Sequence, residues 1–140
     1  MFKTLEGVRV IDFGMAAAGP VVGKILREYG AEVIMVEPVN GTSTRWMDRS
    51  YDYWANGKKS VPVNIKTPEG REIVYRLVKS ADVFLSNYRE KALINNELTY
   101  EKLKAINPGI IYARMYGWGP KGPLKDSPAY DITAFWARGG

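Results

Sequence analysis

The stretch Val8-Arg9-Val10-Ile11-Asp12-Phe13-Gly14-Met15-Ala16-Ala17-Ala18-Gly19-Pro20 predicts a buried strand, a turn of very small residues and then a helix. Its first half is a short apolar run of strand-forming residues. Gly14 permits backbone angles that residues with a Cβ avoid, and Pro20 suits the first helical position, where a missing N–H costs nothing. Such a unit turns free N–H groups and the positive end of a helix outward, so the stretch predicts an anion site that a ligand can approach closely.

The residues after this stretch repeat the alternation of strand and helix. A strand over 5–13, a helix over 20–29 ended by Gly30, and a strand over 32–36 stopped by Pro38 form a β-α-β unit. A helical crossover implies parallel pairing and a right-handed connection. The pattern therefore predicts an α/β fold, Rossmann-like and doubly wound, with a mostly parallel sheet in one domain over residues 1–140.

Further elements follow the same rules. Strands are expected over 60–65, 82–87 and 110–115, although Pro62 argues against an interior position for the first of these. Helices are expected over 67–80 with Thr67 as N-cap, 90–94, 100–106 with Thr99 as N-cap, and 128–138. The aromatic-rich segment 45–56 is expected to be irregular, either packed on the body of the domain or forming the wall of a substrate pocket.

Composition limits the chemistry. The 140 residues are 46% hydrophobic and contain neither Cys nor His, which excludes disulfides, Ser-His-Asp triads and His-based zinc sites within them. We expect no metal, and no run approaches the ~18 apolar residues of a membrane span. A cytoplasmic protein without a membrane partner is therefore expected. The net charge of +5 is compatible with a basic solvated surface, with a phosphate-bearing small molecule or, least of all, with nucleic acid, which we do not expect as a partner.

Two common phosphate-binding motifs fail. Gly14 and Gly19 have the spacing of a P-loop, but Pro20-Val21 follow where Lys and a hydroxyl residue are required. A dinucleotide fingerprint needs closer glycine spacing than this turn provides. Glu37 does end the second strand, where a ribose-binding acid belongs, so a nicotinamide-dependent oxidoreductase remains a weak alternative.

Short motifs cover nearly the whole chain in a characteristic order and spacing: residues 5–13, 18–20, 30–34, 36–38, Asn56-Gly57-Lys58-Lys59-Ser60, 66–72, 81–84 with Asn87, 106–108, 117–120, 122–123 and Tyr130-Asp131. Together they resemble the N-terminal part of the family III CoA-transferases, which include formyl-CoA, carnitine and bile-acid CoA-transferases and the α-methylacyl-CoA racemases. Residues 87–93 and 128–140 look most like the 2-hydroxyacyl-CoA transferases of that family, which act on acids such as phenyllactate or 2-hydroxyisocaproate.

The resemblance implies a mechanism and an assembly. Such enzymes move CoA between carboxylic acids through anhydride and thioester intermediates on one Asp nucleophile. They have a Rossmann-like large domain and a smaller second domain, and they form an interlocked homodimer. By the family pattern the nucleophile lies beyond Gly140 and is not Asp131, so we expect an N-terminal fragment that is inactive alone, and we assign no catalytic residue in it.

The resemblance also assigns residues that bind coenzyme A or an acyl-CoA. Ala17 and Ala18 match positions at the thioester end of CoA, and in some relatives a Gln replaces Ala17. The remaining matches are Val63 to Lys66 beside the adenine and phosphates, with Lys66 as phosphate partner; Asn87, Tyr88 and Arg89 at and after the end of the strand expected over 82–87; and Tyr130 near the reacting centre. Four of these residues also have a purely structural interpretation: a tight turn for the two alanines, a surface residue for Lys66 and core packing for Tyr88.

Two departures from the family pattern matter, and one matching residue separates the branches of the family. Pro38 and Asn95 stand where some relatives have a phosphate-binding Arg, and Arg45, Arg89 or Lys91 could substitute. Tyr130 stands where the racemase branch has a His that transfers protons near pH 7, which favours a transferase over a racemase. A non-catalytic α/β module that assembles with another chain remains an alternative.

Overall fold

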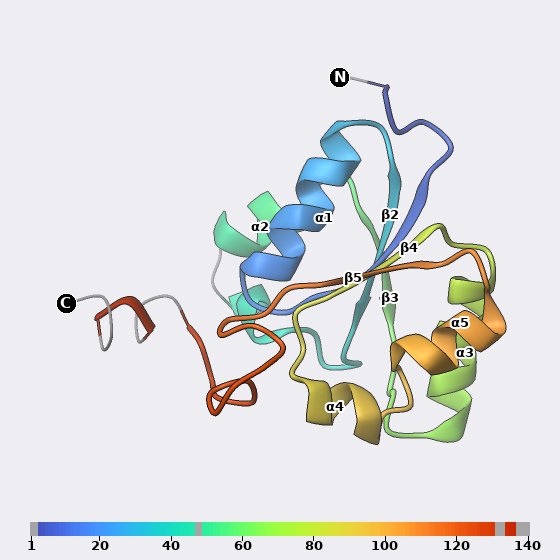
Figure 1. Ribbon diagram of the computed structural model, residues 1–140. Coiled ribbons are helices and arrows are strands. Elements are labelled where there is room, and N and C mark those ends of the chain that lie inside the picture. The colour runs from blue at the N-terminus through green and yellow to red at the C-terminus, as the bar shows by residue number, and fades with distance from the viewer. Residues whose placement is uncertain (1–2, 47–48, 131–133, 137–140) are drawn as a thin grey trace.

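Five short apolar runs form one sheet in which every strand pairing is parallel. The computed structural model describes residues 3–46, 49–130 and 134–136. The strand order is β3-β2-β1-β4-β5, so the chain winds outward in both directions from a central β1, and the doubly wound α/β prediction is confirmed (Figure 1). The strands are β1 (Arg9–Phe13), β2 (Glu32–Glu37), β3 (Lys59–Pro62), β4 (Val83–Ser86) and β5 (Ile111–Arg114).

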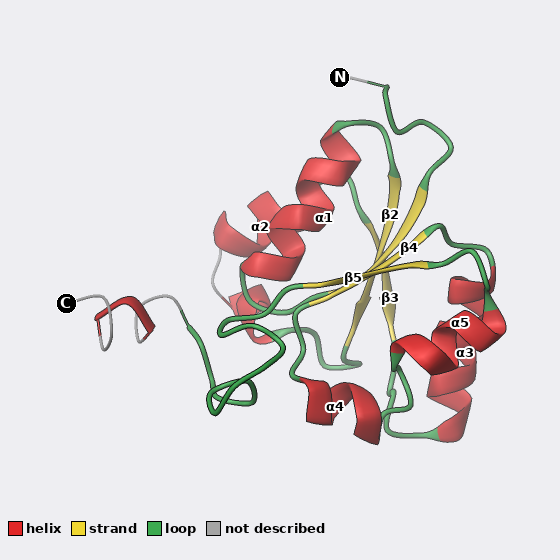
Figure 2. Cartoon of the chain, in the orientation of Figure 1, coloured by secondary structure: helices red, strands yellow, loops and turns green. Residues whose placement is uncertain are grey.

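Helices cover both faces of this sheet (Figure 2). On one face, Val22 and Leu26 of α1 pack against Val10, Val33 and Leu85, and α2 lies beside α1. The opposite face holds the larger core, to which α3, α4 and α5 contribute buried valine and leucine side chains. The helices are α1 (Ala18–Glu28), α2 (Arg49–Ala55), α3 (Pro68–Lys79), α4 (Glu90–Asn95) and α5 (Tyr100–Ile106).

The predicted helix ends are confirmed where the sequence carries a capping residue. The Thr67 hydroxyl accepts a hydrogen bond from the Gly70 N–H at 3.1 Å, and the Thr99 hydroxyl accepts one from the Lys102 N–H at 3.4 Å. Gly30 follows α1 with φ +105°, a left-handed conformation that glycine adopts without strain. Local side-chain chemistry therefore fixed these boundaries.

Five predictions need correction or lie outside the described residues. The strand expected over 5–13 begins only at Arg9, because residues 4–7 form a turn. The α1 helix begins at Ala18, two residues before Pro20, which still lies in the first turn where its missing N–H is tolerated. Segment 45–56 is not irregular: a 3₁₀ turn over Ser43–Trp46 precedes α2. The strand expected over 60–65 ends at Pro62, at the edge of the sheet that proline tolerates. Of the helix expected over 128–138, residues 134–136 are helical, and 131–133 and 137–138 lie outside the described residues.

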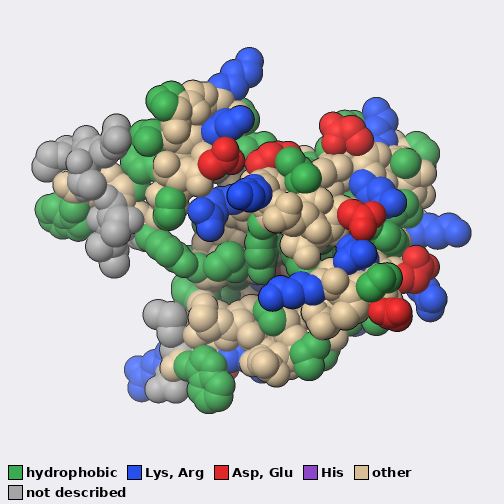
Figure 3. All heavy atoms as spheres, turned by 90° about the horizontal axis from the view of Figure 1, so that it is seen from below, with side chains coloured by type: hydrophobic (Ala, Val, Ile, Leu, Met, Phe, Trp, Pro, Cys, Tyr) green, Lys and Arg blue, Asp and Glu red, His purple; other side chains and the backbone are tan. Residues whose placement is uncertain are grey.

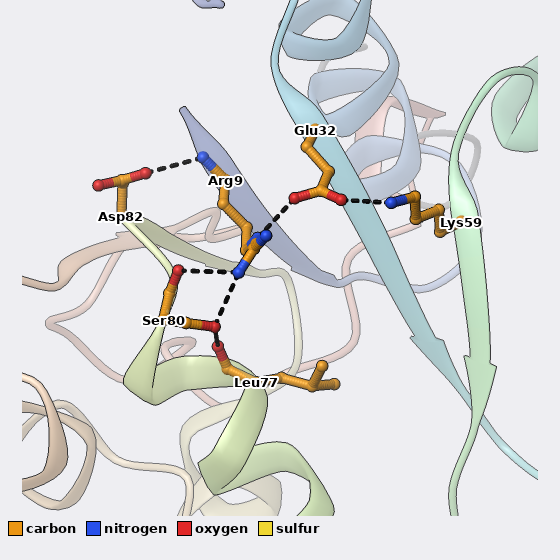
Figure 4. Close-up of polar contacts among 6 residues, drawn as sticks. All are labelled: Arg9, Glu32, Lys59, Leu77, Ser80 and Asp82. Atoms are coloured by element: carbon orange, nitrogen blue, oxygen red, sulfur yellow. Dashed lines mark hydrogen bonds and ion pairs between the residues drawn. The ribbon is translucent and has the colours of Figure 1, made fainter. Parts of the chain in front are cut away.

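Charged groups join the strands at the amino edge of the sheet (Figure 4). The Arg9 N–H donates to Asp82 at 2.7 Å, and its guanidinium donates to Glu32 at 2.5 Å and to the Ser80 hydroxyl at 3.0 Å. Lys59 also pairs with Glu32, whose pKa is lowered by these two cations. These charged groups bond to one another at the amino edge, whereas open α/β sheets bind ligands at the carboxyl ends of their strands.

Candidate functional site

The carboxyl ends of β1 and β4 lie side by side, and the chain leaves them toward opposite faces of the sheet. Such a switch point is where open α/β sheets form a ligand crevice. The turn over residues 14–17 follows β1, and Asn87 follows β4. The structure thus brings two predicted groups to one place: Ala17 and Ala18, which are both exposed, and the segment that begins at Asn87.

The Asn87 side chain holds the turn after β1. Its Oδ1 accepts a hydrogen bond from the Met15 N–H at 2.8 Å, and its Nδ2 donates to the Met15 carbonyl oxygen at 2.8 Å. A Cβ at Gly19 would lie 2.7 Å from Gly14 Cα and 3.1 Å from Asn87 Oδ1. Glycine is therefore needed at positions 14 and 19 because the two backbones approach each other closely, and not because Gly14 has a positive φ. The residue with positive φ in this turn is Ala16, at 55°.

The two residues after Asn87 have different surroundings. The Tyr88 ring stacks on Phe13 with centroids 4.6 Å apart, and burial raises the pKa of its hydroxyl. Arg89 is exposed, and one of its guanidinium nitrogens lies 3.4 Å from the Asp126 carbonyl oxygen. Tyr88 thus contributes to the core, as its structural interpretation predicts, whereas Arg89 can reach a ligand at the surface.

Two further sets of predicted residues lie apart from the switch point. Val63 and Lys66 follow β3, three strands from β4 and so roughly 14 Å away across the sheet. Val63 is 3% exposed and packs in the core, while Lys66 is exposed. Tyr130 is 58% exposed; its neighbour Ala129 fills the place that a Cβ would take at Gly117, just beyond β5.

Beneath α1 lies a buried ion pair that the sequence reasoning missed. Lys58 Nζ donates to Asp12 Oδ2 at 2.6 Å and to the Pro20 carbonyl oxygen at 2.7 Å, and both charged side chains are fully buried. A Cβ at Gly23 would lie 2.4 Å from Asp12 Oδ2, so glycine is needed there. The sequence did carry one indication of this ion pair. Asp12 stands inside the apolar run of β1, and a charge buried there requires a partner of opposite sign.

A second polar cluster stands at the carboxyl end of β2. Arg45 Nε donates to Glu37 Oε2 at 2.8 Å, and both Arg45 Nη2 and the Ser60 hydroxyl donate to Glu37 Oε1. The Arg45 bonds hold the pKa of Glu37 below its usual value, although the carboxylate is 2% exposed. This arrangement engages both groups, and it does not favour Arg45 as the substitute phosphate ligand.

A pocket opens between the turn after β1 and helix α2. Gly14, Met15 and Ala16 of the turn form one side, and Tyr51 and Trp54 of α2 form the other. Tyr51 and Trp54 of the aromatic segment thus line a small hollow of about 10 Å³, the size of one water molecule, and the role of the segment as the wall of a substrate pocket stays a prediction. Figure 3, which views the molecule from below, shows Lys and Arg side chains interspersed with Asp and Glu. Within the described residues no three His, Cys, Asp or Glu side chains gather to hold a metal ion, and no helix is long and apolar enough to cross a membrane.

Comparison with known proteins decides the family. The profile of CoA-transferase family III matches residues 5–140. The chain belongs to CoA-transferase family III. This confirms the resemblance seen in the sequence motifs.

Individual relatives agree with this family. The chain is 40% identical to an (R)-2-hydroxy-4-methylpentanoate CoA-transferase of Clostridioides difficile, over 97% of this chain and 37% of that protein. It is 37% identical to a cinnamoyl-CoA:phenyllactate CoA-transferase of Clostridium sporogenes, over 96% and 36%. A crystal structure of a CAIB/BAIF family protein from Brucella suis superposes with a TM-score of 0.90 at 36% identity, covering 99% of this chain and 40% of that one. The family III chain thus spans a little over a third of the length of these relatives.

Proposed function

We propose that residues 1–140 are the N-terminal CoA-binding part of an enzyme that moves CoA between carboxylic acids, 2-hydroxy acids among them. One observation carries the proposal within the family: exposed Ala17 and Ala18, at the end of the turn and the start of α1, stand at the switch point, and Asn87 holds that turn in place. The named relatives that act on 2-hydroxy acids support the substrate class.

The geometry suggests a division of roles. The first N–H groups of α1 have no acceptor within the helix, and the small side chains before them leave room for a thioester. The exposed Lys66, at the far side of the same edge, would pair with phosphate. Asn87 acts by positioning the turn. The carboxylate that takes the acyl group and then CoA, forming an anhydride and a thioester in turn, would come from an Asp outside these residues.

Calorimetric titration of this 140-residue chain with CoA tests the proposal. We expect weak but measurable binding, lowered by Lys66→Ala and unchanged by Lys79→Ala, a matched exposed lysine at the end of α3. We expect no transfer between any acyl-CoA and acid. Absence of CoA binding would refute the coenzyme site, and turnover by the chain would refute an external nucleophile.

Exposed aromatic side chains support a second candidate, an assembly module. Phe135 and Trp136 are 60% and 71% exposed near the end of the chain, where they could pack on another chain. The interlocked homodimer implied by the family is one form of such assembly. Light scattering with and without CoA separates the candidates, because association without CoA affinity favours a non-catalytic module.

A further inference from the structure

We infer that Arg114, the last residue of β5, is a positioning residue that keeps Arg89 available to a phosphate of CoA. The inference rests on the proposed function, since it takes Arg89 to lie against the bound coenzyme. Arg89 is exposed shortly after β4, whereas the Arg114 side chain is 9% exposed at the carboxyl end of the neighbouring strand. The two arginines thus stand at the same edge of the sheet, one at the surface and one buried.

The Arg114 guanidinium holds the segment that carries Arg89. Its Nη2 donates to the Tyr88 carbonyl oxygen at 3.0 Å, and its Nη1 donates to Glu90 Oε2 at 2.5 Å. Its Cζ lies 4.6 Å from the centre of the Tyr116 ring. Arg89 therefore has a bonded residue on each side in the chain, and one planar group makes both bonds.

Stability alone does not account for this buried cation. Arg114 Nε is buried and has no hydrogen-bond partner among the described residues, which is unfavourable for a charged group. Its carboxylate partner, Glu90, is 49% exposed, so water weakens the attraction. An apolar side chain of similar volume, such as Met, would avoid both costs. What the guanidinium adds is a fixed set of bonds to the segment around Arg89.

The ion pair with Glu90 also preserves the positive charge of Arg89 for a ligand. Glu90 follows Arg89 directly, and a carboxylate near a bound phosphate would repel it or compete with it for Arg89. In the structure this carboxylate bonds to Arg114 instead. The Arg89 guanidinium lies 3.4 Å from the Asp126 carbonyl oxygen, a neutral acceptor at a long distance. A phosphate oxygen is charged and would displace that contact.

Chemical-shift titration of this chain with CoA tests the inference, because the method also measures weak binding. We expect Arg89→Ala to lower the affinity for CoA about tenfold, the size of one charged hydrogen bond. Arg114→Met should lower it by a similar factor although Arg114 is buried. The double variant should bind no more weakly than Arg89→Ala, because Arg114 acts through Arg89. A purely structural role of Arg114 would give additive losses.

Further variants separate positioning from a folding defect. Glu90→Gln added to Arg114→Met should restore the affinity about threefold, because no carboxylate is left to compete for Arg89. Arg9→Met is the matched control: Arg9 also bonds a carboxylate, that of Glu32, but at the amino edge (Figure 4), and its loss should leave CoA affinity unchanged. If Arg114→Met unfolds the chain, Arg114→Lys replaces it in the same double-variant comparison, since it keeps the charge and loses the planar pair of donors.

The outcomes separate the two proposals. Unchanged CoA affinity in Arg114→Met, or a further loss when this change is added to Arg89→Ala, would overturn the inference while CoA binding by the unaltered chain still supports the proposed function. Unchanged affinity in Arg89→Ala would overturn it as well. Failure of the unaltered chain to bind CoA would refute the proposed coenzyme site itself, and the inference with it.

Discussion

The buried pair of Asp12 and Lys58 leads to the sharpest stability prediction. Lys58→Met removes the ammonium group that lies 2.6 Å from Asp12 Oδ2 and 2.7 Å from the Pro20 carbonyl oxygen. Among the described residues Asp12 Oδ1 has no hydrogen-bond partner, so the variant would leave the whole carboxylate buried and unpaired. Breaking a pair of this kind costs about 3–5 kcal/mol of unfolding free energy. At roughly 3 °C per kcal/mol, the melting temperature should fall by about 10 °C or more.

Urea unfolding followed by circular dichroism measures this loss. Lys59→Met is the matched control: the neighbouring lysine is 69% exposed and pairs with Glu32 at the surface, so its loss should cost less than about 1 kcal/mol. The double variant Asp12→Leu/Lys58→Met should recover most of the stability, because no charge remains buried. A cost below about 1 kcal/mol for Lys58→Met, the level of a surface pair, would refute the reasoning.

Three further predictions concern single side chains. Asn87→Ala should destabilise the chain by about 1–3 kcal/mol, because it leaves the Met15 N–H and carbonyl unpaired. Hydrogen exchange should then be faster at the Met15 amide, and an unchanged rate would contradict the view that Asn87 holds the turn. Burial raises the pKa of Tyr112 to about 12, so the contribution of its protonated hydroxyl to stability is complete below pH 10 and is lost as pH rises through 12. In Tyr112→Phe the ultraviolet titration should lack the last tyrosine step, and an unchanged curve would be inconsistent with this assignment. Because Arg45 lowers the pKa of Glu37 from 4.5, ionised Glu37 stabilises the fold above that pH, and the contribution is lost on further acidification. Glu37→Gln should make the free energy of unfolding less dependent on pH in this acid range. A parallel decline of that free energy in both proteins would argue against this role.

Much of the fold could be read from local patterns. The apolar runs located all five strands, and Thr67 and Thr99 located the starts of two helices. The short helix α2 could not be found in this way. Its seven residues are too few for a stable isolated helix, so packing against α1 decides its conformation.

Some features of the candidate site could likewise be predicted from the sequence, and others could not. The small residues Ala17 and Ala18 marked the turn after β1 from the sequence, together with the family to which the chain belongs. Contacts across long separations could not be read: Asn87 binds Met15 from 72 residues away, and Lys58 reaches Asp12 from 46 residues away. These partners meet only because the sheet brings distant strands side by side.

The sequence by itself thus determined the five strands and their parallel pairing, because backbone propensity and hydrophobic period act over a few neighbouring residues. Its motifs also determined the family. The tertiary structure decided which polar groups are available to a ligand. Glu37 and Arg45 looked like candidates for ribose and phosphate, yet they are engaged with each other. Burial makes such pairing necessary, and burial is a property of the folded chain rather than of any one stretch of it.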